Sequence, residues 1–153
     1  MPARAETSAG FTILELLVSM AIILTVAAMA VPALMASVES ARVARAVGDI
    51  TALEDDIAAY EAANGSLPNT LADIGRDKLL DPWGTPYQYL NFANAMGKGQ
   101  MRKDRFLVPI NSDYDLYSMG EDKQTSSPLT AKVSQDDVIR GSDGSYVGLA
   151  SNY

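Results

Sequence analysis

The chain has 153 residues, enough for one domain, and it contains neither Cys nor His. This composition excludes disulfides and nucleophile–imidazole catalysis and argues against a zinc site, so any bound metal should be a hard cation held by oxygen atoms. The 12 basic and 19 acidic residues leave a net charge of −7, which argues against a nucleic-acid-binding surface.

An apolar segment begins close to the N-terminus. Residues 11–36 carry a single charge, Glu15, and residues 16–36 are 21 positions without a charge, long enough to span a bilayer as a helix. A cleaved secretory signal is the alternative, but its apolar core has about 7–15 residues and this segment is longer. We therefore expect a retained membrane anchor. Pro32 should kink or loosen this helix, because it removes one backbone hydrogen bond.

The helical pattern continues beyond the apolar segment. Apolar residues recur every three or four positions from Val43 to Tyr60, which predicts one buried stripe on an amphipathic helix. Asn64 and Gly65 form a typical helix end. We expect one helix from Phe11 to about Ala63, with the stripe of its second half covered by the rest of the chain.

Turn and strand signals follow the helix. Aromatic and polar residues alternate in two segments, which predicts strands, and Asp-Pro-Trp-Gly is typical of a tight turn. The expected elements are a short helix at 71–74, a turn at 81–84, strands within 85–92 and 113–120, and a tail at 136–153 that closes the head as a strand or an ordered loop.

Three further predictions concern the second half of the chain. Tyr87 and Tyr89 should share one face of their strand. Residues 106–110 should form a short edge strand, whose pairing Pro109 limits. Residues 93–105 are rich in Gly and charge, and we expect a solvated loop tip, with binding to a partner as the alternative. The basic residues of this loop are Lys98, Arg102, Lys103 and Arg105.

The sequence G-F-T-I-L-E-L-L-V at residues 10–18 resembles the N-terminus of type IV pilins and type II secretion pseudopilins. Those proteins carry a short polar leader that ends in Gly, a Phe after the cleavage point, a Glu as the fifth residue after it, and a long apolar helix that commonly contains a Pro near the position of Pro32. The resemblance implies that a prepilin peptidase removes residues 1–10 by cutting between Gly10 and Phe11, and N-methylates Phe11. The leader here is less basic than is typical.

Glu15 has a physical role on this reading. A carboxylate in hydrocarbon costs roughly 2.5–3.5 kcal/mol, whereas the α-amine that cleavage creates at Phe11 is a cation one helical turn away. In a filament, Glu15 could neutralise the amine of a neighbouring subunit and so select the axial register. The alternative is that Glu15 lies at the lipid interface as a residue of the helix start, where the helix dipole favours an acid.

The segments L-L-D-P-W-G-T-P-Y-Q-Y-L and D-Y-D-L-Y-S-M-G-E-D, at 79–90 and 113–122, resemble the major pseudopilin of the type II secretion system. The resemblance implies an α+β, type IV pilin-like fold, in which a long N-terminal helix packs against a small antiparallel sheet. The implied domains are a leader at 1–10, a transmembrane and filament-core helix at 11–36, and a periplasmic head at 37–153 that includes the rest of the helix.

The family also implies the function. The chain would be a structural subunit of a pseudopilus, anchored by a single pass in the bacterial inner membrane with its head in the periplasm. Its partners would be further copies of itself, the prepilin peptidase, the inner-membrane assembly platform and minor pseudopilins. A type IV pilin for adhesion, motility or DNA uptake is the alternative. A membrane-anchored enzyme is disfavoured, because no nucleophile motif or Gly-rich phosphate loop occurs.

In that family the loop after the second of these segments binds Ca²⁺ through carbonyl groups and aspartates, an oxygen set that suits a hard cation. The match is imperfect, since Lys123 stands where a Gly is usual and the loop is longer. The alternative is an Asp-rich surface loop stabilised by ordinary turns. The matching strand end is Ser118, Met119, Gly120 and Asp122, and the candidate ligands are Met119, Asp122, Asp136 and Asp137.

Overall fold

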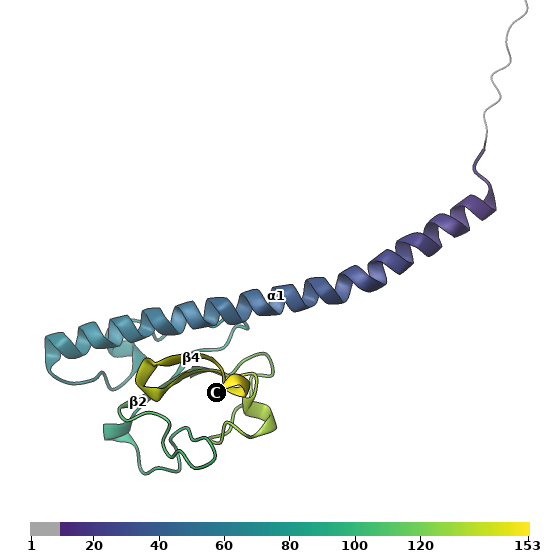
Figure 1. Ribbon diagram of the computed structural model, residues 1–153. Helices are drawn as coiled ribbons and strands as arrows, with labels where there is room; N and C mark the ends of the chain where they lie inside the picture. Colours follow the sequence, from purple (N-terminus) through teal and green to yellow (C-terminus); the bar gives the residue numbers. More distant parts are fainter. Residues whose placement is uncertain (1–9) are drawn as a thin grey trace, which may run out of the picture. The chain divides into compact units, whose positions relative to one another are not determined.

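The computed structural model describes residues 10–153, and residues 1–9, which hold most of the expected leader, lie outside the described residues (Figure 1). The backbone contacts divide the chain into two units. The first ends at Glu39, and the second, the head, comprises Ser40–Tyr153.

Helix α1 comprises Ile13–Asn64, 52 residues, and is continuous through Pro32. The prediction of one long helix with a stop at Asn64-Gly65 is confirmed. The Gly65 amide donates the last bond, to the Glu61 carbonyl at 2.7 Å, and Gly65 itself has a φ of +74°, the left-handed conformation that ends many helices.

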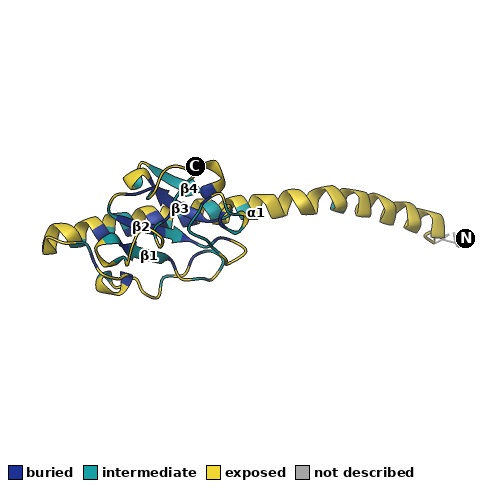
Figure 2. Ribbon diagram, turned by 90° about the horizontal axis from the view of Figure 1, so that it is seen from below, coloured by how far each residue is buried: buried dark blue, intermediate teal, exposed yellow. Residues whose placement is uncertain are grey.

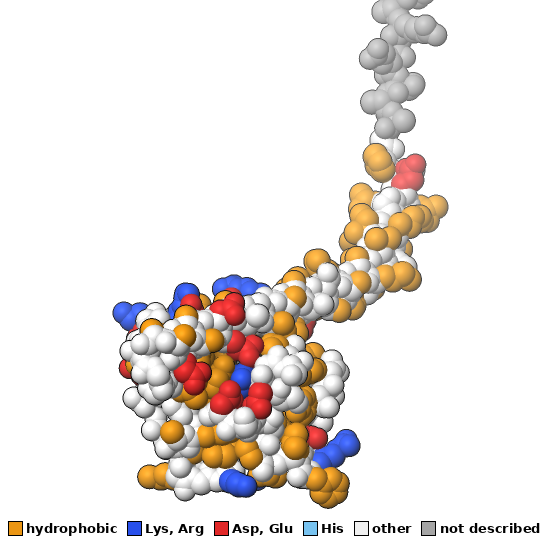
Figure 3. All heavy atoms as spheres, turned by 60° about the vertical axis from the view of Figure 1, so that its left-hand side comes forward, with side chains coloured by type: hydrophobic (Ala, Val, Ile, Leu, Met, Phe, Trp, Pro, Cys, Tyr) orange, Lys and Arg blue, Asp and Glu red, His pale blue; other side chains and the backbone are white. Residues whose placement is uncertain are grey.

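The first part of α1 has no buried side chain between residues 13 and 38 (Figure 2). On the face of the molecule that Figure 3 presents, hydrophobic side chains cover most of this part of the helix. It contains an 18-residue window with a mean hydropathy of 2.4, apolar enough to cross a membrane. Such a surface needs lipid or other protein around it, since monomeric soluble proteins rarely expose an apolar area of this size.

The head contains a four-stranded sheet of order β1-β2-β3-β4, in which every neighbouring pair is antiparallel. Its two faces have separate cores, because successive side chains of a strand point to opposite sides. Leu116 and Val138 belong to the core that contains α1 residues, whereas Ile139 belongs to a second core with Ile110. The strands are β1, Gln88–Asn91; β2, Tyr114–Ser118; β3, Val138–Gly141; and β4, Tyr146–Leu149.

The second part of α1 covers one face of this sheet (Figures 1 and 2). Ala46, Ile50, Leu53 and Ile57 are at most 1% exposed, so the predicted apolar stripe is confirmed. A long N-terminal helix on a small antiparallel sheet is the expected pilin-like α+β fold.

The shorter predicted elements are also present. Leu71–Ile74 is a 3₁₀ helix. The turn at 81–84 closes with a 3.0 Å bond from the Gly84 amide to the Asp81 carbonyl. Tyr87 and Tyr89 pack against the same core, as predicted, and the tail forms the β3–β4 hairpin.

Two predictions for the second half of the chain are wrong. Residues 106–110 form no strand, and Leu107 makes only an isolated bridge with Asp104. Phe106 is fully exposed and only Ile110, at the end of the segment, is buried, so no alternating buried face forms. Pro109 also lacks the amide that a ladder needs. Arg102 is the second correction. It is not part of a solvated loop tip but only 2% exposed.

Candidate functional site

The start of α1 holds both N-terminal candidate sites. Gly10 and Phe11, which flank the expected cut, are exposed, Phe11 by 83%. No heavy atom lies within 4 Å of the position that a Gly10 Cβ would take, among the described residues. The bond between them is therefore accessible in the described part of the chain, as a protease substrate must be.

Glu15 closes a capping box with Thr12. Its carboxylate accepts hydrogen bonds from the Thr12 amide at 2.9 Å and the Thr12 hydroxyl at 2.8 Å. The Glu15 amide in turn donates to that hydroxyl at 3.2 Å. Sequence reasoning missed this arrangement, although Thr-x-x-Glu before an apolar run is its signature. The Glu15 carboxylate is therefore satisfied within its own chain.

The predicted calcium ligands lie at the two ends of the β2–β3 loop, residues 119–137. One oxygen of each of the three aspartates already has a partner in the chain. Asp136 Oδ2 accepts from the Asp122 amide at 2.9 Å, and Asp122 Oδ1 accepts from the Gln124 amide at 2.7 Å. Asp137 is fully buried and forms an ion pair with Arg102. Met119 is half-buried.

These residues do not fit a calcium ion, which prefers six to eight oxygen ligands. Within residues 10–153, no group of three or more His, Cys, Asp or Glu side chains is placed to hold a metal. The one buried carboxylate of the set already contacts a guanidinium. Calcium binding stays a prediction, which a titration can test.

Arg102 is instead held from several sides. Its guanidinium donates to the Asp137 carboxylate, to the Thr125 hydroxyl and, at 2.7 Å, to the Ser126 carbonyl. It also lies 4.4 Å from the centre of the Tyr117 ring, a distance typical of a cation–π contact. Two buried atoms of the ion pair, Arg102 Nε and Asp137 Oδ1, have no hydrogen-bond partner within the described chain.

Burial has the largest effect on the two carboxyls near Arg102. It raises the pKa of Asp137 to about 6, although the hydrogen bond from Thr125 and the Arg102 charge act in the opposite direction. Burial also raises the pKa of Asp115, against hydrogen bonds from the Arg102 amide and the Asn111 side chain. Each carboxyl is thus costly to bury as an ion and depends on its donors.

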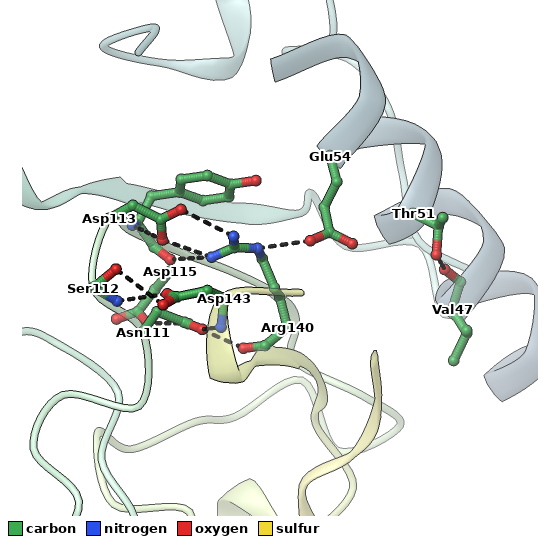
Figure 4. Close-up of polar contacts among 10 residues, drawn as sticks. Val47, Thr51, Glu54, Asn111, Ser112, Asp113, Asp115, Arg140 and Asp143 are labelled. Carbon is green, nitrogen blue, oxygen red and sulfur yellow. Dashed lines mark hydrogen bonds and ion pairs between the residues drawn. The ribbon is translucent and has the colours of Figure 1, made fainter. Parts of the chain in front are cut away.

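A second buried arginine joins the helix to the sheet. Arg140 on β3 donates to Glu54 of α1 at 2.7 Å and to both oxygens of Asp113, at 2.7 and 3.0 Å (Figure 4). Its guanidinium carbon lies 3.9 Å from the centre of the Tyr114 ring. Sequence reasoning assigned no role to Arg140. The available signal was its place two residues after Val138, on the side of β3 that faces the helix.

Gly120, at the start of the β2–β3 loop, should not tolerate a side chain. A Cβ there would lie 2.3 Å from the Asp136 carbonyl oxygen, and its φ is +63°. We expect Gly120→Ala to lower the free energy of unfolding by more than about 2 kcal/mol, measured by denaturant unfolding. Gly75→Ala is the control, because Gly75 has a φ of +70° and no such close atom. Equal losses in the two variants would contradict the contact argument.

The comparisons with known proteins find likeness both in the N-terminal segment and in the head. A family model, the prokaryotic N-terminal methylation motif, matches residues 7–31. The chain is 31% identical over 147 residues to type II secretion system core protein G of Aeromonas hydrophila, which covers 81% of this chain and 90% of the relative. The protein of the same name from Pseudomonas aeruginosa is 30% identical, and the alignment covers 78% of this chain and 87% of that relative. The protein from Escherichia coli is 33% identical, with 74% of this chain and 81% of the relative covered.

No solved structure matches the chain significantly. The alignments with these relatives nevertheless cover most of this chain and most of each relative, so the likeness includes the head as well as the N-terminal motif. The chain therefore belongs to the family of type II secretion system core protein G, the major pseudopilins, which are pilin-like structural proteins with an N-terminal methylation motif and not enzymes.

Proposed function

We propose that this chain is the structural subunit of a pseudopilus in type II protein secretion, cut between Gly10 and Phe11, N-methylated at Phe11, and assembled through α1. The observation that carries this proposal is the pairing of a methylation motif at residues 7–31 with likeness to core protein G over the head. A motif alone would serve any type IV pilin-like protein.

The surface of α1 supports assembly through the helix. Its side chains from 13 to 38 are not buried by their own chain, so each copy needs lipid before assembly and neighbouring helices afterwards. Small residues let such helices approach closely. They occur at Ala21, Ala27, Ala28, Ala30 and Ala36.

The partners follow from this role. A prepilin peptidase would cut the chain in the bacterial inner membrane, where α1 provides a single pass with the head in the periplasm. Further copies would then build the filament, together with minor pseudopilins and the inner-membrane assembly platform. A nucleic-acid partner is not proposed, given a net charge of −7.

Deletion of this chain from its host tests the proposal. We expect exported proteins to accumulate inside the cell while surface pili and twitching motility persist, with the intact chain restoring export as the control. Loss of pili with intact export would instead favour the alternative, a type IV pilin for adhesion, motility or DNA uptake. Mass spectrometry of the mature protein should find N-methylated Phe11 as its first residue.

A further inference from the structure

We propose that the guanidinium of Arg102, and not a bound calcium ion, holds the β2–β3 loop against the sheet, so that the head folds and stays folded without calcium. This inference concerns the stability of the head and does not depend on the role in secretion. It departs from what the family resemblance implies for the same loop.

The contacts of Arg102 supply what a bound cation would supply. The side chain is 3% exposed and neutralises Asp137, which is 0% exposed. The Thr125 hydroxyl accepts from Arg102 and donates to Asp137 Oδ2 at 2.6 Å. One guanidinium thus binds a carboxylate, a hydroxyl and, through Ser126, a carbonyl of the same loop, and its planar fork suits several acceptors at once.

The position of Arg102 is itself fixed by the backbone. Its amide donates to Asp115 Oδ2 on β2 at 2.6 Å, and its carbonyl accepts from the Ile110 amide at 3.0 Å. The next residue, Lys103, exchanges backbone hydrogen bonds with the β2–β3 loop, from the Leu129 amide at 2.9 Å and to the Ser127 carbonyl at 3.1 Å. The segment before β2 is therefore bonded along the loop that follows β2, and Arg102 lies at this junction.

The same geometry opposes a metal ion. A cation that coordinated Asp137 would lie close to the guanidinium, and like charges in a buried site repel strongly. Asp136 and Asp122 are bonded to amides of the loop, so a metal would have to break those turns to recruit them. The buried Oδ1 of Asp137 is the one oxygen of that carboxylate still open to a ligand, and the calcium titration below tests it directly.

The first experiment is a calcium titration of the full chain in detergent micelles. Unfolding of the head is followed by the fluorescence of Trp83, which packs at the edge of the main core. Calcium at about 5 mM exceeds the dissociation constants of weak extracellular sites, about 10⁻⁴–10⁻³ M. A ligand that binds only the folded state would raise the melting temperature. We expect superimposable curves in calcium, in magnesium and in EDTA. A calcium-specific rise that EDTA reverses would overturn the proposal.

The second experiment removes the guanidinium. Arg102→Met keeps an unbranched apolar stem but removes the guanidinium, and it leaves Asp137 buried without its cation. We therefore expect the melting temperature to fall by about 10 °C or more. Arg105→Met is the matched control, an exposed arginine of the same segment, with an expected change below about 2 °C. Equal melting of the Arg102 variant and the wild type would overturn the proposal. If that variant does not fold, the calcium titration of the wild type decides.

Discussion

Replacing Glu15 by Gln should abolish filament assembly as completely as replacing it by Ala. Gln retains an acceptor for the Thr12 capping box but loses the charge that would neutralise the Phe11 amine of a neighbouring subunit. An unpaired charge in an apolar bundle costs roughly 2.5–3.5 kcal/mol, which corresponds to about a 100-fold weaker association of each subunit.

The measurement is the yield of filaments sheared from cells that produce each variant. Mass spectrometry must first establish that both variants are cut at Phe11, so that a loss reflects assembly and not processing. Thr12→Ala is the control, because it removes the cap hydroxyl at 2.8 Å from Glu15 and leaves the carboxylate. Normal filaments from the Gln variant would contradict charge pairing and favour a role in helix capping or at the lipid interface.

The second large effect is expected at Arg140. Arg140→Met would leave Glu54 and Asp113 without a cation between the helix and the sheet, where their side chains are only 18% and 33% exposed. We expect a loss of about 3 kcal/mol in the free energy of unfolding, or about 10 °C in melting temperature, because removing one member of a buried pair leaves an uncompensated charge.

The control for this prediction is an exposed arginine on α1. Arg45 is 65% exposed and its nitrogen lies 3.7 Å from Asp49 in a single surface ion pair, so Arg45→Met should cost less than about 0.5 kcal/mol. Thermal unfolding of the full chain in detergent micelles, again followed by Trp83 fluorescence, measures both. Similar losses in the two variants would mean that Arg140 contributes no more than a surface charge.

The helix and the sheet could be predicted because their signals are local. The steps of three and four residues along α1 indicate one face, and the alternation around Tyr89 and Leu116 indicates strands. Asn64-Gly65 and Asp81-Pro82 mark ends and turns by their own backbone preferences. Each of these signals depends on residues within a few positions of one another.

The two buried arginines could not be predicted in this way. Arg102 stands in a segment rich in Gly and charge, which is typical of solvated loops, and its partner Asp137 is 35 residues further along the chain. Arg140 and Glu54 are 86 residues apart. No periodicity records which distant carboxylate a guanidinium will meet. The expected strand at 106–110 also failed on long-range contacts, because within residues 10–153 this segment pairs with none of the four strands and Leu107 makes only an isolated bridge with Asp104.

The cap at the start of α1 also bears on when subunits begin to attract one another. Before cleavage the nitrogen of Phe11 is an uncharged peptide amide, and the Glu15 carboxylate is already satisfied by Thr12 of its own chain. If Glu15 pairs with the Phe11 amine of a neighbour as proposed, uncut copies can accumulate in the bilayer without forming that ion pair. Hydrolysis of the Gly10–Phe11 bond, which is irreversible, then gives each copy the charged amine that this ion pair requires. The onset of filament growth therefore depends on the protease and not on subunit concentration alone.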